Sequence, residues 1–171
     1  RAKELLHLFR EYTPDICFHL EIHPALLSEE LKEELAILPN GLLHLEAGIQ
    51  SLREPVLEKS RRIGKLSDAL QGLKYLCSLK NMETHADLIA GLPLYHLSEI
   101  FEDVRTLAEY GAGEIQLESL KLLPGTEMRR RAEELGIQYS PLPPYEVLQT
   151  KEISVEELQT AHYLSRLLDG F

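Results

Sequence analysis

The sequence is poor in cysteine, in basic residues and in long apolar runs, and each shortage excludes a class of protein. Its two cysteines, Cys17 and Cys77, are too few for a disulfide framework, which predicts a reducing, cytoplasmic location. Lys and Arg number 18 against 28 Asp and Glu, so the net charge of −10 opposes binding to nucleic-acid phosphates. No apolar stretch is long enough for a membrane span. We therefore expect neither a nucleic-acid partner nor a membrane.

The beginning of the chain lacks an initiating methionine. Arg1 leads directly into a helical pattern of apolar residues: Leu5, Leu6, Phe9 and Tyr12. We expect a fragment of a longer protein. Its 171 residues, 44% of them hydrophobic, suffice for one domain with a core, and both cysteines are expected to be inert residues of that core.

Short apolar runs alternate with amphipathic helical segments, as in βαβ units. We predict strands at 15–22, 42–49, 84–90 and 114–122. Helix signals separate or follow them: an N-cap at Ser28, apolar helical spacing from Leu66 to Cys77, a stop near Gly111, a helix that ends before Gly136, and a capping box of Ser154 and Glu157. We predict a barrel part at 1–140 and, after a proline-rich crossing, a C-terminal extension with a helix at 141–171.

All four predicted strands share one polar pattern. They contain His19-Leu20-Glu21, His44-Leu45-Glu46, His85-Ala86-Asp87 and Gln116-Leu117-Glu118. Side chains alternate between the faces of a strand, so the polar residues share one face and the apolar residues pack under helices on the other. A doubly wound sheet has helices on both faces and near-continuous apolar strands. The pattern therefore predicts an α/β fold with a partial parallel (βα) barrel, an incomplete TIM-like barrel of about four strands, and a polar lumen.

Carboxylates inside a barrel need partners, because burying them alone costs several kcal/mol. A bound polar ligand is one solution, and a structural ion-pair network completed by absent strands is another. A third possibility is a metal site, because imidazole and carboxylate suit zinc, manganese or iron, and this would make the chain part of a metal-dependent barrel hydrolase.

Longer segments narrow these alternatives. They are 45–51 (LEAGIQS) with Leu57 and Arg62 after it, 87–93 (DLIAGLP), 120–126 (LKLLPGT) and 143–151 (PPYEVLQTK). In this order and at these distances they resemble the later strands of radical S-adenosylmethionine (radical SAM) enzymes, and the last resembles a subgroup with an N-terminal cobalamin-binding domain. Gly91 and Gly125 follow strands, at the end of a barrel where active sites form, and glycine there allows the backbone to approach a ligand.

The resemblance implies cofactors that this chain does not hold alone. In that family a [4Fe-4S] cluster on a Cys-x3-Cys-x2-Cys loop binds SAM, and cobalamin is a further possible cofactor. The loop and the glycine-rich motif expected after the second strand are absent from this sequence. The resemblance thus implies that the first strand here is the family's third, that the N-terminal part is missing, and that this chain alone is not catalytic.

The resemblance also assigns roles to individual residues. It places Glu21 near the SAM ribose or methionine end, Gln50 and Ser51 near the nucleoside, Arg62 (or its neighbour Arg61) at the SAM carboxylate, and Asp87 and Ile89 beside the adenosine. Glu46, Glu118 and Lys121 are implied on the substrate side. The substrate and the reaction stay open.

A non-enzymatic alternative also stays open. An incomplete barrel exposes two sheet edges, and such edges can pair with another copy of the chain. The chain is then a folding or interaction module.

Overall fold

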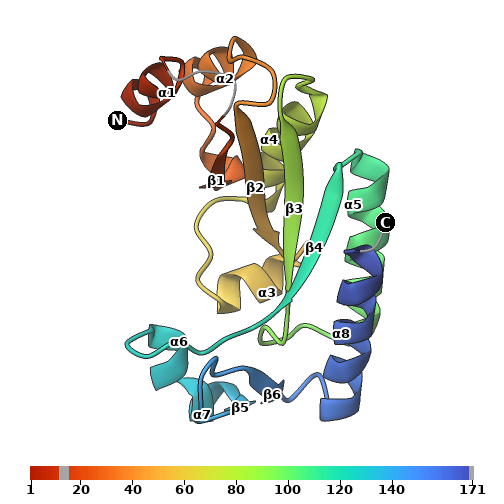
Figure 1. The fold of residues 1–171 in the computed structure, drawn as a ribbon. Helices are drawn as coiled ribbons and strands as arrows, with labels where there is room; N and C mark the ends of the chain where they lie inside the picture. The colour runs from red at the N-terminus through yellow and green to blue at the C-terminus, as the bar shows by residue number, and fades with distance from the viewer. Residues whose placement is uncertain (12–15, 170–171) are drawn as a thin grey trace.

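The computed structural model describes residues 1–11 and 16–169, and its elements follow the predicted alternation (Figure 1). In chain order they are α1 (Ala2–Phe9), β1 (Phe18–Ile22), a 3-10 helix η1 (Pro24–Leu26), α2 (Glu29–Ala36), β2 (Leu43–Gln50), α3 (Glu54–Lys59), α4 (Leu66–Ser78), β3 (Glu83–Ala90), α5 (Leu97–Tyr110), β4 (Glu114–Ser119), α6 (Glu127–Arg130), α7 (Ala132–Leu135), β5 (Gln138–Tyr139), β6 (Val147–Gln149) and α8 (Val155–Leu168).

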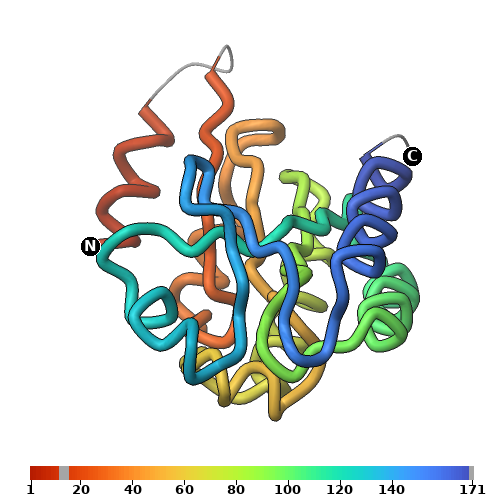
Figure 2. Tube along the Cα trace, turned by 90° about the horizontal axis from the view of Figure 1, so that it is seen from below, coloured from red at the N-terminus to blue at the C-terminus, as the bar shows by residue number. Residues whose placement is uncertain are grey.

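The four main strands form one parallel sheet in the order β1-β2-β3-β4. Helix α4 packs against β2 and β3, α5 packs against β3 and β4, and α8 lies beside α5 and against β4 (Figure 2). The prediction of four parallel strands with helices outside is confirmed.

Burial alternates along the strands as the polar pattern predicts. On β2 the buried residues are Leu43, Leu45, Ala47 and Ile49. They join one hydrophobic core with apolar residues of α4 and α5, such as Leu73, Leu76, Ile100 and Leu107. The intervening residues of β2 are only partly buried. The helix-facing side of the sheet therefore supplies the core, and the polar side is left to form a site.

Several predicted boundaries need correction. β1 begins at Phe18, and Tyr12 and Asp15 lie outside the described residues. Cys17 is exposed, so its prediction as a core residue is wrong, whereas Cys77 is half-buried against the core. β4 ends three residues before the predicted end at 122, because Leu122 N–H donates to Tyr145 O at 2.9 Å. Pairing with the C-terminal extension thus replaces pairing within the sheet.

The helix signals are largely confirmed. Ser28 caps α2 by accepting from Leu31 N–H at 3.2 Å, and Ser154 and Glu157 form the predicted capping box of α8. Gly111 ends α5 in the left-handed conformation, with φ of 79°. The segment before Gly136 differs, because it divides into two short helices, α6 and α7, that meet at Arg131.

One glycine allows a close contact at the carboxyl end of β1. A Cβ on Gly72 of α4 would lie 2.1 Å from the carbonyl oxygen of Pro24 in η1. Real atoms do not approach this closely, so α4 and η1 can pack as they do only with glycine at 72. The contact between Gly72 and Pro24 therefore holds the segment that follows β1 against α4.

The chain after β4, including the C-terminal extension, continues past the carboxyl ends of the strands and then returns along the sheet as α8. Figure 1 shows α6, α7, β5 and β6 below the sheet, and α8 rising along its edge. Arg129 lies over the rings of Tyr139 at 5.1 Å and Tyr145 at 4.6 Å, which links α6 to the β5–β6 hairpin. Within residues 1–11 and 16–169, no helix has the length and apolar character that crossing a membrane requires.

Candidate functional site

The polar residues of all four strands converge on one cavity of about 380 Å³. This volume falls in the range of small-molecule sites. Its lining is Glu21, Ile22, His23, Glu46, Gly48, Gln50, Arg62, Asp87, Ile89, Gln116 and Glu118. The structure therefore brings together every residue predicted on the SAM or substrate side except Ser51 and Lys121.

Strand register explains the convergence. Glu21 pairs with Glu46 across β1 and β2, Gly48 pairs with Asp87 across β2 and β3, and Ile89 pairs with Glu118 across β3 and β4. Parallel strands with alternating side chains carry these residues to the same face. They lie toward the carboxyl ends of the strands, where parallel barrels hold their ligands.

Asp87 has the most perturbed carboxyl group of the cavity. Burial, with the nearby negative charge of Glu46, raises the pKa of Asp87 from 3.8 to about 6. Its Oδ1 atom is buried and has no hydrogen-bond partner among the described residues. A carboxyl group with this pKa can exchange a proton near neutral pH, and its open oxygen is available to a ligand.

Arg62 is the cation of the cavity. Its Nη2 donates to Gly48 O at 2.6 Å, and a Cβ on Gly48 would lie 3.1 Å from that nitrogen. Burial lowers the pKa of Arg62, and its Nε has no partner among the described residues. Arg61, the near alternative, points elsewhere and forms an ion pair with Glu127. Arg62 is therefore positioned to receive an anionic group.

His23 is a cavity residue that the sequence interpretation missed. It directly follows β1, and both of its ring nitrogens are buried without a partner within the described ranges. Burial and the charge of Arg62 lower the pKa of His23, which favours the neutral imidazole. The available signal was its position one residue after a strand whose polar face was already assigned to the lumen.

Ser51 does not line the cavity. It is fully buried, and its hydroxyl donates to Asp103 Oδ2 at 3.3 Å. Strand alternation explains this placement, because Gln50 shares the polar face with Glu46 and Gly48, whereas Ser51 falls on the opposite side, which faces α5. Gln50 also has a φ of 73°, and the β2–β3 register shifts between Gly48 and Gln50.

Lys121 lies beside the cavity rather than in it. Its Nζ is 3.1 Å from Glu118 Oε2, and it lines a neighbouring cavity of about 340 Å³ next to α8. Glu118 lines both cavities. Gly91 has a φ of 89°, and a Cβ there would lie 3.3 Å from Val147, whereas Gly125 has open space around it and a φ of 85°. Both are turn glycines, and the close approach at Gly91 is to the extension.

The histidines of the pattern form a separate row on the polar face. The rings of His19 and His44 stack with centroids 4.2 Å apart, and His44 meets His85 edge-on at 4.0 Å. His85 Nε2 is 2.7 Å from Glu114 Oε2, and its Nδ1 is 3.0 Å from Gln116 Nε2. The part of the chain that the structure describes contains no group of three or more His, Cys, Asp or Glu placed to hold a metal ion. The metal alternative thus finds no support, and the row is held by ring stacking and by the contacts of His85 with Glu114 and Gln116.

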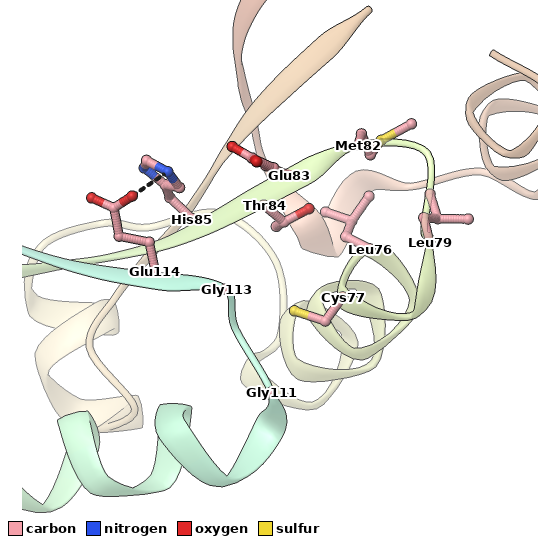
Figure 3. A pocket seen from close by; sticks show the side chains of 10 residues that line it. All are labelled: Leu76, Cys77, Leu79, Met82, Glu83, Thr84, His85, Gly111, Gly113 and Glu114. Atoms are coloured by element: carbon pink, nitrogen blue, oxygen red, sulfur yellow. Dashed lines mark ion pairs between the residues drawn. The ribbon is translucent and has the colours of Figure 1, made fainter. Parts of the chain in front are cut away.

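A second cavity, of about 350 Å³, lies at the opposite ends of the strands (Figure 3). Figure 3 shows His85 and Glu114 at one side of it and Cys77 of α4 at the other. Burial raises the pKa of the Cys77 thiol and so disfavours the reactive thiolate. The amino ends of barrel strands serve stability rather than catalysis, so the first cavity is the candidate site.

Comparisons with known proteins agree on the fold. A model of a family described as a protein of unknown function (DUF4080) matches residues 133–171. No curated protein matches the chain. Among solved structures, the radical S-adenosylmethionine methyltransferase TsrM from Kitasatospora setae, with cobalamin and a [4Fe-4S] cluster bound, is 19% identical with a TM-score of 0.62, over 91% of this chain and 34% of TsrM. TsrM with tryptophan substrate and a SAM analogue gives 17% identity and a TM-score of 0.62, over 94% of this chain and 33% of that one.

A second enzyme shares the same architecture. Coproporphyrinogen III oxidase (HemN) from Escherichia coli, a radical SAM enzyme, is 16% identical with a TM-score of 0.58, over 79% of this chain and 37% of HemN. The chain spans about a third of the length of these structures. Together with the four-stranded parallel sheet, they show that this chain has the fold of a partial radical SAM barrel with a C-terminal helix, resembling that of a cobalamin-containing member.

Proposed function

We propose that this chain forms the SAM- and substrate-side wall of the catalytic barrel of a radical SAM enzyme of the oxidoreductase or methyltransferase type. One observation carries the proposal: Glu21, Gln50, Arg62 and Asp87 come from separate segments and line a single cavity at the carboxyl ends of the strands. The fold shared with TsrM and HemN supports it.

The polar side chains that line the cavity suit the functional groups of SAM. Arg62, with its unpartnered Nε, suits the carboxylate of the methionine part, because a guanidinium pairs well with a carboxylate. Glu21 and Asp87 suit the ammonium group and the ribose hydroxyls, and Gln50 suits the nucleoside. Ile89 offers an apolar contact to adenine. Bound there together with a reduced cluster, SAM would supply radical chemistry to the substrate.

An iron–sulfur cluster does not fit the residues of this chain. The sequence has two cysteines, Cys17 and Cys77, and burial raises the pKa of Cys77, whereas a cluster ligand must be a thiolate. We propose that the cluster ligands belong to an N-terminal part of the same full-length protein. A preceding cobalamin-binding domain is part of this proposal, supported by the likeness to TsrM and by the tail motif at 143–151.

The substrate side is assigned to the acidic wall. Glu46 and Glu118 line the cavity, and Lys121 stands at its rim paired to Glu118. With its raised pKa, Asp87 can accept a proton near neutral pH, when a substrate donates one. We place residues 1–140 in the barrel and 141–171 in the extension, in a cytoplasmic enzyme.

The edge strand β1 is where we propose that an N-terminal part of the full-length protein adjoins the sheet. β1 stands at one edge of the sheet, whereas α8 packs against β4 at the other. We propose that earlier barrel strands continue from β1. A second copy of this chain at the same edge is the alternative, and a concentration-dependent dimer of the isolated chain in sedimentation would favour it.

The test is SAM binding by the full-length protein with its cluster reconstituted. Gln50→Ala and Glu21→Ala are each expected to weaken SAM binding in calorimetry about tenfold, the value of one strong hydrogen bond. The matched changes Gln71→Ala and Glu58→Ala, at exposed helical positions, should leave the affinity unchanged. A full-length protein that binds no SAM, or cavity variants that bind it as tightly as their controls, would refute the proposal.

A further inference from the structure

One buried carboxylate joins the two loops that leave the central strands. Asp103 of α5 is 1% exposed, and it accepts hydrogen bonds from two directions. After β2, Ser51 Oγ donates to it at 3.3 Å, Leu52 N at 2.7 Å and Arg53 Nε at 2.9 Å. After β3, Tyr95 Oη donates at 2.6 Å. Asp103 thus connects both segments at the carboxyl end of the sheet.

Each of the two loops contains a strained residue directly before its contact with Asp103. Gln50, before Ser51, has a φ of 73°, and Leu94, before Tyr95, has a φ of 66°. A side chain in the left-handed region is unfavourable, so such conformations persist only where the surroundings enforce them. The residue directly after each of them is bonded to Asp103, so these bonds help to hold both conformations, together with the turn bond from Tyr95 N–H to Leu92 O at 3.3 Å.

The conformation of Gln50 decides where its amide lies. Gln50 lines the cavity, and its Nε2 lies 3.5 Å from the position that a Cβ on Gly48 would occupy, beside Arg62 Nη2 at 3.1 Å. Strand alternation already directs Gln50 to the face of Glu46 and Gly48. The left-handed backbone and the register shift at residue 50 turn the chain at this point, where Ser51 reaches Asp103 and the amide of Gln50 lies beside Arg62.

We propose that Asp103 is a positioning residue of the cavity: by clamping the loops after β2 and β3, it holds Gln50 and its neighbours in the geometry that binds the ligand. The inference rests on the proposed function of the cavity and adds to it a residue that touches neither SAM nor substrate.

The chemistry of the clamp requires a carboxylate. Four residues contact Asp103, all through N–H or O–H groups and Arg53 through both Nε and Nη2, so the side chain must act only as an acceptor. Burial, with the adjacent charge of Asp103, raises the pKa of Tyr95, which keeps its hydroxyl a donor. Oδ2 accepts from Ser51, Leu52 and Tyr95, and Oδ1 accepts from Arg53, so an asparagine at 103 would turn an N–H₂ group either toward Arg53 or toward the other three donors.

The experiment compares Asp103→Asn with Leu107→Ala in the reconstituted full-length protein. Leu107 lies on the same helix and is fully buried, so its truncation lowers stability without touching the clamp. At a temperature where both variants are folded, Asp103→Asn should weaken SAM binding about tenfold and Leu107→Ala less than twofold. Tyr95→Phe removes a single bond, keeps the contacts of the other three residues, and should weaken SAM binding about threefold.

Hydrogen exchange separates failure of this inference from failure of the proposed function. In Asp103→Asn, amide exchange at residues 50–53 and 94–95 should accelerate at least about tenfold more than in Leu107→Ala. If the wild type binds no SAM, the proposed function fails, and exchange alone still tests the clamp. Equal exchange in the two variants, or equal loss of SAM affinity, would overturn the role of Asp103.

Discussion

The two halves of the polar face are built from the same sequence pattern and differ in whether their polar groups have partners. In the amino-terminal half, His85 is held by Glu114 at 2.7 Å and by Gln116 at 3.0 Å, and the rings of His19 and His44 stack on each other. In the carboxyl-terminal half, buried atoms of Asp87, Arg62 and His23 have no partner among the described residues.

We therefore interpret the amino-terminal half as a structural network and the carboxyl-terminal half as the candidate binding site. Buried polar groups are nearly always paired in native proteins, so unpaired groups that converge on one cavity indicate a ligand. The separation is not complete, because His44 keeps one unpartnered nitrogen, Nε2. Burial lowers the pKa of His44, as do the adjacent His85 and His19, so it is neutral at pH 7 and needs no counter-charge.

The largest expected effect concerns the packing that supports the cavity end. Gly72→Ala should lower the free energy of unfolding by about 3 kcal/mol, because its Cβ would collide with the backbone of Pro24. Gly113→Ala, at the imidazole end, is the control, because its Cβ would meet Thr84 O at an ordinary 3.6 Å. Denaturant unfolding of both variants measures the difference. Equal destabilisation by the two substitutions would show that the carboxyl ends of the strands are packed no more closely than their amino ends.

The next effect tests whether the imidazole row is structural. His85 has a side chain 9% exposed, and His85→Ala should cost about 2 kcal/mol of unfolding free energy, because it leaves a small cavity and removes the partner of Glu114. His19→Ala is the control, since that side chain is 60% exposed and should cost less than about 0.5 kcal/mol. Thermal unfolding of the isolated chain compares them. If the His85→Ala protein is as stable as the wild type, the histidine row has no structural role.

The smallest effect concerns Asp87 in the cavity, where a substitution should raise the free energy of unfolding instead of lowering it. The folded protein holds the Asp87 proton more tightly than the unfolded chain, because the pKa rises from 3.8 to about 6. Asp87 therefore lowers the unfolding free energy as pH rises from about 4 to about 6, and the loss persists above that. Asp87→Asn removes this cost and should stabilise the chain by about 1 kcal/mol above pH 6, after allowance for partial exposure.

Measuring unfolding at pH 4 and at pH 7 checks both the sign and the window of this effect. Toward pH 4 the gain from Asp87→Asn should fade. Asp68→Asn, at an exposed position on α4, should give no gain at either pH. A gain of the same size at both pH values would contradict the link to the buried carboxyl group.

Much of the fold was predictable because its signals are local. Alternation along 43–50 correctly separated the buried Leu45 from the lumenal Glu46. The caps at Ser28 and Ser154 and the stop at Gly111 depend on a few neighbouring residues, and all three are confirmed. The end of β4 was placed too late because Leu122 pairs with Tyr145, far along the chain, and no local pattern reports that pairing.

The candidate site was less accessible to prediction. An acid on the apolar face of a helix was a usable signal for Asp103, which falls between the buried Ile100 and Leu107, since a buried carboxylate requires partners. Ser51 was assigned to the SAM side by the resemblance alone, whereas alternation from Glu46 through Gln50 places it on the opposite face, where it bonds to Asp103. His23 continues the period of two from His19 and Glu21 and could have been found by it, whereas Lys121 is three residues after Glu118 and out of that period.

The sequence by itself determined which side chains of each strand share a face, and therefore that carboxylates and imidazoles would line one side of a parallel sheet covered by helices on the other. This follows from the geometry of a single strand and needs no knowledge of its neighbours. Only the tertiary structure decided which of those groups pair and which stay open around the cavity. Pairing depends on strand register, on the turn at Gln50 and on helix contacts such as that of Gly72 with Pro24, all of which join residues distant in the chain.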